Sequence, residues 1–332
     1  MEILELKHSG LTCDLGGFTI DPFRPVKNAL ITHAHGDHAR SGSEHYFAVK
    51  DAEPILRKRL GDIQLTTFSY GEVFKLGEVE VSFHPAGHIM GSAQVRIEYQ
   101  GEVWVFTGDF KRDPDPTCPP FEVVPCDVFI SEATFSLPVY RWPSFEEVMK
   151  EAHEWWMKNK EEGFNSVICC YALGKAQRVI AGLRELTHDT IWVHGTIDEV
   201  NRCYAQNGME WENVHKVPLS DEGKGEKLKD SLILCPPSAL GSAWAKRLSP
   251  KKVAFASGWM RLRGNRRRKG YERGFVISDH ADWPSLLKTV EETGCSKVYF
   301  THGQTDSIIQ YLREKGISAY DLKMPYEVDG ES

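Results

Sequence analysis

The chain has 332 residues, of which 41% are hydrophobic and 26% are charged, and its formal net charge is -7. This composition is typical of a globular enzyme and excludes a basic surface over the whole protein, and no segment is apolar for long enough to span a bilayer. The first ten residues match neither a signal peptide nor a transit peptide, so a cytoplasmic location is expected.

Eight cysteines are spread along the chain, and none of them forms a C-x-x-C spacing. A cytoplasmic compartment keeps cysteines reduced. We therefore expect reduced, mostly structural thiols.

Short β-like runs dominate the first third of the chain. Glycine, proline and aspartate turn signals separate them, which is typical of stacked sheets. The runs cover residues 17–21, 29–32, 79–83, 94–99 and 103–107.

From Ser144 onward, helices and strands alternate in the manner of α/β crossovers. The prediction is a helix over 144–159, a strand over 167–171, a helix over 175–186, a strand over 190–193 and a helix over 196–207. The style of the first third then returns, with a strand over 275–278, a helix over 283–292, a strand over 297–301 and a helix over 307–315. The sequence therefore predicts an α/β domain formed by residues 1–141 and 274–332, interrupted by a smaller α/β lobe over residues 142–273.

The densest group of metal-ligand side chains lies in the segment His33-Ala34-His35-Gly36-Asp37-His38, directly after a β run. Imidazole and carboxylate groups suit zinc or a similar divalent metal. His33 and His35 stand at alternate positions and can face one ion, while Asp37 and His38 turn toward a second. Four such side chains together would be unusual as ordinary core residues.

Three further candidates each follow a β run and adjoin a glycine: His88, Asp109 and His302. A carboxylate at Asp109 could bridge two cations and hold them about 3.5 to 4 Å apart. Taken alone, each of the three could equally be an ordinary loop residue, and only the nearby cluster favours metal binding.

These motifs resemble those of the metallo-β-lactamase superfamily over nearly the whole chain. The resemblance implies a four-layered αββα fold that holds two divalent metal ions, zinc or alternatively manganese. The implied ligands are His33, His35 and His88 for one ion, Asp37 and His38 for the other, and Asp109 between them. Asp21 matches an early aspartate that supports the metal loop without binding metal.

Two later motifs, Ser131-Glu132-Ala133-Thr134 and Ser278-Asp279-His280-Ala281-Asp282, resemble those of the β-CASP nucleases. The resemblance implies that Glu132 orients His280 near the leaving group, where an imidazole can protonate a departing alkoxide near neutral pH. It also makes His302 a ligand of the second metal ion. The alternative for residues 278–282 is a helix N-terminal cap.

The resemblance divides over the substrate. A histidine at position 302 is more typical of RNA-cutting members, whereas the stretch from Ala256 to Trp283 most resembles bacterial DNA exonucleases associated with DNA ligase. We give the longer match more weight and expect a metal-dependent DNA exonuclease that acts from the 5′ end in DNA repair, in functional association with a DNA ligase. Its implied chemistry is hydrolysis of phosphodiester bonds by a hydroxide shared between two metal ions.

Three alternatives stay open. An RNA-processing β-CASP ribonuclease would use the same site, whereas a thioester or lactone hydrolase would not need the Glu132 and His280 pair. A non-catalytic nucleic-acid-binding scaffold would have lost metal ligands, and this chain has every expected one.

A basic run over residues 261–273 holds seven lysines and arginines and a single acid, Glu272. The arginine fork suits phosphate, so the run predicts a nucleic-acid surface. The predicted contacts are Arg261, Arg263, Arg266 and Arg267. Trp259 and Tyr271 flank the run and could stack on bases or pack beneath it.

Lys175 follows Gly174 at the start of a predicted helix, where a backbone phosphate is favoured. The segment resembles the Gly-Arg-Ala-Gln element of β-CASP proteins, with lysine in place of arginine. We expect Lys175 and Ser278 to contact substrate, although ordinary helix initiation explains Lys175 equally well.

Overall fold

The computed structural model describes residues 2–218, 228–262, 264 and 271–323. The chain forms two compact units: unit 1 contains residues 1–141 and 280–332, and unit 2 contains residues 142–279. Unit 2 is therefore an insertion within unit 1. The sequence prediction ended the insertion at Arg273, whereas the structure divides the units between Asp279 and His280.

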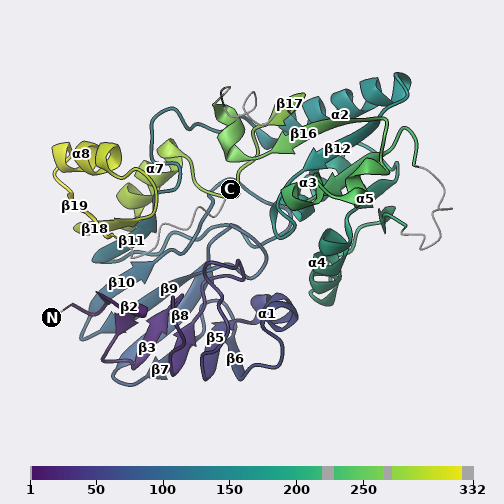
Figure 1. Ribbon diagram of the computed structural model, residues 1–332. Helices are drawn as coiled ribbons and strands as arrows, with labels where there is room; N and C mark the ends of the chain where they lie inside the picture. Colours follow the sequence, from purple (N-terminus) through teal and green to yellow (C-terminus); the bar gives the residue numbers. More distant parts are fainter. Residues whose placement is uncertain (1, 219–227, 263, 265–270, 324–332) are drawn as a thin grey trace. The chain divides into compact units, whose positions relative to one another are not determined.

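Unit 1 is built on two sheets (Figure 1). Sheet A contains, in spatial order, β1 (Glu5–Lys7), β2 (Gly10–Cys13), β3 (Phe18–Ile20), β4 (Asn28–Leu30), β5 (His45–Val49) and β6 (Leu65–Phe68). Sheet B contains, in spatial order, β19 (Ser318–Asp321), β18 (Lys297–Thr301), β11 (Val128–Glu132), β10 (Glu102–Phe106), β9 (Ala93–Tyr99), β8 (Val79–Pro85) and β7 (Val73–Leu76). The backbone N–H of Ala93 donates to the carbonyl of Thr32 over 2.8 Å and links β9 to the loop after β4.

Helices complete unit 1. The 3-10 turn η1 (Lys50–Ala52) and helix α1 (Glu53–Leu60) connect the parallel strands β5 and β6. Helices α7 (Trp283–Thr293) and α8 (Asp306–Glu314) pack on sheet B. Their contact is apolar: residues such as Leu286 and Ile308 share one buried cluster with Phe129 and Phe300 of the sheet. The layered α/β arrangement expected from the sequence is confirmed.

Unit 2 contains sheet C, whose six strands are all parallel. Their spatial order is β14 (Val214–Lys216), β13 (Ile191–Val193), β15 (Leu232–Cys235), β12 (Asn165–Cys169), β16 (Lys251–Ala256) and β17 (Arg273–Phe275). The connecting helices are α2 (Phe145–Glu161), α3 (Lys175–Arg184), α4 (Gly195–Gln206) and α5 (Ala243–Lys246), with the short 3-10 turns η2 (Pro237–Ala239) and η3 (Gly258–Arg261). Because βαβ crossovers cover a parallel sheet with helices, its central strands are buried: β12 and β15 are buried along their whole length, and β15 is entirely apolar.

The strand predicted over 275–278 lies earlier than expected. Residues Arg273–Phe275 form β17, which pairs with β16 and so belongs to sheet C of unit 2 rather than to unit 1. This pairing explains the later boundary, because the chain is still part of unit 2 when it reaches Phe275.

All eight cysteines are free thiols, and six of them are buried. Burial raises the pKa of Cys170, and burial together with the neighbouring Cys295 raises the pKa of Cys126 to about 12. Within the described ranges, no helix combines the length and the apolar character needed to cross a membrane.

Candidate metal centre

The loop from His33 to His38 follows β4 and closes on its own backbone. The N–H groups of His38 and Ala39 both donate to the carbonyl of His35, over 3.3 and 2.8 Å. This turn places ligand-type side chains on successive positions at one end of sheet A.

Three imidazole nitrogens meet beside this loop. His35 Nδ1 lies 3.1 Å from His33 Nε2 and 3.1 Å from His88 Nε2. Tetrahedral zinc with Zn–N bonds of about 2.0–2.1 Å would set its ligand atoms about 3.3 Å apart. Together with a carboxylate of Asp109, these nitrogens form a compact group of potential ligand atoms. The donor set and its spacing fit a zinc ion.

Asp109 stands between two groups of histidines. Its Oδ2 lies 3.5 Å from His33 Nε2 and 3.7 Å from His88 Nε2, while its Oδ1 lies 3.5 Å from His38 Nε2. Gly108 makes this position accessible, because its φ is +54° and an added Cβ would lie 2.6 Å from Thr32 Oγ1. The two oxygens of Asp109 therefore face the two halves of the cluster.

The second half contains His38, Asp37 and the buried Asp21. Asp21 Oδ2 lies 2.8 Å from His38 Nδ1, and this contact turns His38 Nε2 toward Asp37 Oδ2 at 3.6 Å. The other carboxylate oxygen of Asp21 accepts from the N–H of Thr32 over 2.8 Å. Asp21 thus links Thr32 and His38, the two ends of the loop, through its carboxylate. Its own φ of 42° is in the left-handed region.

His302 follows β18 and also lies near this half. Its ring centroid is 6.3 Å from that of His38, and its Nδ1 lies 3.1 Å from Thr301 Oγ1. Its φ is +61°, and a Cβ on the next residue, Gly303, would lie 2.0 Å from the carbonyl oxygen of Ala133. The turn after β18 is therefore held tightly against the loop after β11.

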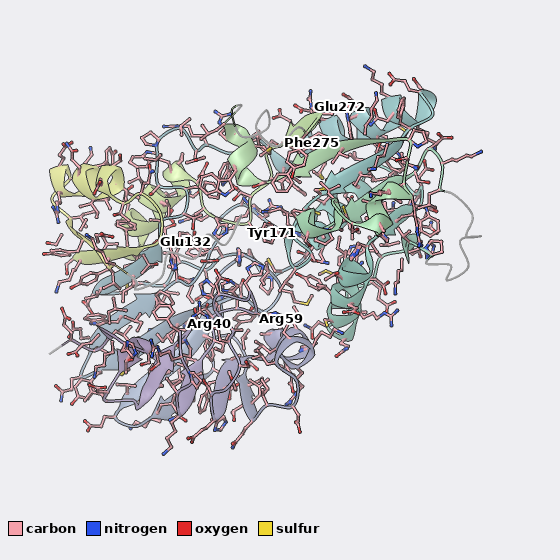
Figure 2. All side chains as sticks on the ribbon, viewed as in Figure 1. Arg40, Arg59, Glu132, Tyr171, Glu272 and Phe275 are labelled. Carbon is pink, nitrogen blue, oxygen red and sulfur yellow. The ribbon has the colours of Figure 1, made fainter. Side chains whose placement is uncertain are left out.

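Glu132 and His280 form a buried pair, although 148 positions separate them in the chain. Glu132 Oε2 lies 2.8 Å from His280 Nδ1 and accepts from Thr134 Oγ1 over 2.7 Å, while Oε1 accepts from the N–H of Phe110 over 2.7 Å. Figure 2 labels Glu132, which ends β11. Asp282 is the N-cap of α7 and accepts from Ser285 N over 3.1 Å, so the capping interpretation is right for that residue.

The charges of the site explain its protonation states. Burial and the neighbouring His38 and His88 hold the pKa of His33 well below its usual range, which leaves the neutral imidazole that metals bind. Burial opposes charge on His38, but Asp109 and Asp37 outweigh it and raise the pKa of His38 to about 10. Burial also opposes ionisation of Glu132, yet His280 brings the pKa of that carboxyl below its usual value.

The predicted substrate contacts lie in unit 2. Lys175 is fully buried, and its Nζ lies 3.5 Å from Asp279 Oδ2 and 5.1 Å from the centroid of the Tyr171 ring. Ser278 is buried, and its carbonyl accepts from Arg178 Nη1 over 3.0 Å. Arg261 is exposed.

The rest of the basic run is only partly described. Arg263, Arg266 and Arg267 lie outside the described residues. Tyr271 stacks on Phe255 with centroids 5.0 Å apart, and Trp259 also packs against the buried cluster around Phe255. Both aromatic side chains thus follow the packing interpretation in this structure.

Several supporting residues escaped the sequence analysis: Thr32, Thr134 and Arg59. Thr32 Oγ1 donates to Asp21 Oδ2 over 2.6 Å, and Arg59 Nη1 donates to the carbonyl of Ala34. Thr32 and Thr134 adjoin predicted motifs, so their position was a usable signal. Arg59 lies in another element, and no sequence pattern marks it.

Known proteins similar to this chain were found in sequence and in structure. No family model matches the chain. The chain is 28% identical over 310 residues to a "Probable DNA ligase" of Opitutus terrae, which covers 92% of this chain and 30% of that protein. It is 27% identical over 201 residues to a ribonuclease of Thermus thermophilus, which covers 49% of this chain and 44% of that protein. These relatives fit the resemblance of the chain to β-CASP nucleases of the metallo-β-lactamase fold.

A solved structure has the same fold. A protein of unknown function from Enterococcus faecalis superposes with a TM-score of 0.62 at 14% identity, over 91% of this chain and 80% of that one. The chain spans less than half the length of the two curated relatives named above. Their activities are therefore a basis for a proposal about this chain.

Proposed function

We propose that the chain is a metal-dependent nuclease that hydrolyses phosphodiester bonds in nucleic acid. The observation that carries this proposal is the approach of three imidazole nitrogens, from His33, His35 and His88, with a carboxylate of Asp109 within reach. When bound there, two divalent metal ions, zinc in the first instance, activate water and neutralise charge on the phosphoryl oxygens. His33, His35 and His88 would hold the first ion and Asp37, His38 and His302 the second, with the Asp109 carboxylate available to both.

The residues of the chain supply the proton for the leaving group. Glu132 stays ionised and keeps a proton on His280 Nδ1, so that His280 Nε2 is free to give its proton to the departing oxygen. The three hydrogen bonds to the Glu132 carboxylate fix the orientation of the carboxylate and, through it, that of the His280 ring. The pair thus acts as a positioned general acid.

We propose DNA as the substrate, with exonuclease action from the 5′ end in DNA repair. The support is the relative named as a probable DNA ligase, because the similarity covers 92% of this chain. The segment similar to this chain makes up 30% of that relative, which is named as a probable DNA ligase. This arrangement favours a functional association between the present chain and a DNA ligase. Contacts from Lys175, Ser278 and the arginines Arg261, Arg263, Arg266 and Arg267 belong to the same proposal.

RNA is the second candidate. His302 favours it by resemblance, and so does the relative named as a ribonuclease, which aligns with about half of the chain. Both substrates would use the same metal centre.

One digestion experiment tests these proposals. Metal-loaded protein is incubated with single-stranded DNA and RNA of one sequence, labelled separately at each end, beside an Asp37→Ala control. Stepwise shortening of DNA from its 5′ end, absent from the control, is the expected result. Cleavage of RNA alone would replace the DNA proposal, and equal activity of the Asp37→Ala variant in metal-depleted buffer would refute the two-metal mechanism.

A further inference from the structure

Helix α1 contributes an arginine to the metal loop. Arg59 Nη1 donates to the carbonyl of Ala34 over 2.5 Å and lies 3.4 Å from the carbonyl of Ala39 (Figure 2 labels Arg59). Ala34 lies between His33 and His35, and Ala39 directly follows His38. One guanidinium therefore spans both ends of the loop that carries four of the proposed metal ligands.

The contact has the geometry of a fixed support. Both alanines are buried, so their carbonyls need a donor inside the protein. The carbonyl of His35 accepts from within the loop, whereas those of Ala34 and Ala39 turn to Arg59. A guanidinium presents several N–H groups in a rigid planar fork and can hold two acceptors at once, which a lysine ammonium does less well.

Gly36 leaves room for the guanidinium. A Cβ built on Gly36 would lie 3.2 Å from Arg59 Nη2, and no other neighbour lies within 4 Å of it. The backbone of Gly36 is outside the left-handed region, so its lack of a side chain serves space rather than conformation. The guanidinium also interacts with the charge of Asp37.

The same helix contacts the second ligand loop. A Cβ on Gly91 would lie 2.4 Å from Ala52 Cα, so the turn after His88 packs directly on the start of α1. Ile55 and Leu56 are buried and anchor the helix. Helix α1 is thus a shared base for the loop at His33–His38 and the loop at His88.

We propose that Arg59 is a positioning residue for the metal centre: its guanidinium fixes the loop between Ala34 and Ala39 so that His33, His35, Asp37 and His38 are arranged for metal before it binds. This inference rests on the metal site of the proposed function. Residues that orient metal ligands from outside contribute about 10- to 100-fold to metal affinity.

The test measures zinc affinity by competition with a chelator, independently of nuclease activity. Arg59→Ala should weaken zinc binding by about 10- to 100-fold. Arg57→Ala is the matched control, because Arg57 lies on the same helix, carries the same charge and pairs with Glu53 away from the loop. Arg59→Lys should recover part of the affinity. Unchanged zinc affinity in Arg59→Ala, or an equal loss in Arg57→Ala, would overturn the proposal.

A double-mutant cycle with Gly36→Ala isolates the contact. Gly36→Ala should weaken zinc binding in the wild-type background, where the methyl group crowds the guanidinium, and should have little effect in the Arg59→Ala background. An identical effect in both backgrounds would refute the contact. If Arg59→Ala fails to fold, Arg59→Lys replaces it as the second background of the cycle.

Kinetics separate this role from substrate binding and from the proposed function. With DNA as substrate, Arg59→Ala should lower kcat at limiting zinc, recover at saturating zinc and keep the wild-type KM. A raised KM with normal zinc affinity would make Arg59 a substrate contact and overturn the positioning role. If the zinc affinity depends on Arg59 as expected but the wild-type protein cuts no nucleic acid, the nuclease proposal alone is refuted.

Discussion

Asp21 determines which nitrogen of His38 can face a metal ion. Its Oδ2 lies against His38 Nδ1, so that nitrogen keeps its proton, and Nε2 is the nitrogen that would lose its proton to bind a metal ion. The contact also orients the ring toward Asp37 and Asp109. Asp21, which is not a proposed ligand, therefore determines the orientation and the proton position of His38, which is one.

Asp21→Asn should lower zinc affinity by about 10- to 100-fold. If the amide nitrogen replaces Oδ2, a donor faces His38 Nδ1 and drives the proton to Nε2, the nitrogen needed for metal. The affinity is measured by chelator competition, with Asp62→Asn as an exposed control. Wild-type zinc binding in Asp21→Asn would show that the carboxylate does not set the tautomer.

Glu132→Gln should lower kcat by about 10²- to 10⁴-fold while the bound metal stays at the wild-type level. The amide cannot stabilise a protonated His280, although its oxygen can still accept from the N–H of Phe110. Single-turnover kinetics and metal analysis of the same preparation check this. Loss of metal in step with activity would instead indicate that Glu132 supports the metal ions, since it lies close to Asp109.

At the scale of elements, the ends of strands bring the site together. β8, β10, β11 and β18 of sheet B each deliver one site residue just beyond or at their carboxyl end. Glycines in tight turns allow the loops to approach one another. The closest approach is at Gly303, where an added Cβ would lie 2.0 Å from the carbonyl oxygen of Ala133.

Gly303→Ala should destabilise the protein more than Gly316→Ala. Both glycines have positive φ, +79° and +84°, so an alanine in the left-handed conformation lowers the stability of either variant by about 1–2 kcal/mol. Only Gly303 has a neighbour, Ala133 O at 2.0 Å from the added Cβ, and overpacking adds about 1–3 kcal/mol. Urea unfolding of the two variants measures the difference, and equal midpoints would argue against the close approach of the two loops.

Some of the site residues could be predicted from local sequence patterns, and others could not. The strand ends that carry His88, Asp109 and His302 follow from local patterns of apolar runs and glycines, and the structure brings the first two together with His33 and His35. The pairing of Glu132 with His280 followed only from the family resemblance, because no local pattern joins residues 148 positions apart. The contact of Arg59 with the loop could not be predicted, because Arg59 binds backbone carbonyls, and every residue type has a backbone carbonyl.

Lys175 illustrates the same limit. A lysine at the start of a helix after a glycine predicts an anion site from local sequence. In the structure, Asp279, more than a hundred positions away, lies beside Lys175 in a buried ion pair. Only tertiary packing could reveal that partner.

At the scale of the whole molecule, metal should stabilise the two units unequally. All of the proposed ligands belong to unit 1. A ligand present at 100 times its Kd stabilises the state that binds it by about 2.7 kcal/mol. Hydrogen exchange should therefore slow in residues 33–38 and 86–92 when zinc is added, and stay unchanged in β12 and β15 of unit 2. Equal protection of sheet C would indicate that the units unfold as one.

The border between the units has a consequence for the history and the engineering of this chain. Unit 2 ends at Asp279, and the next residue is His280, the partner of Glu132. A chimaera that takes unit 2 from another parent must therefore be spliced within one peptide bond of the proposed general acid. No proposed site residue adjoins Trp142, where the chain enters unit 2, whereas the exit directly precedes His280. Lobes swapped between relatives should thus be tolerated only when the residues before His280 come with a matching backbone path.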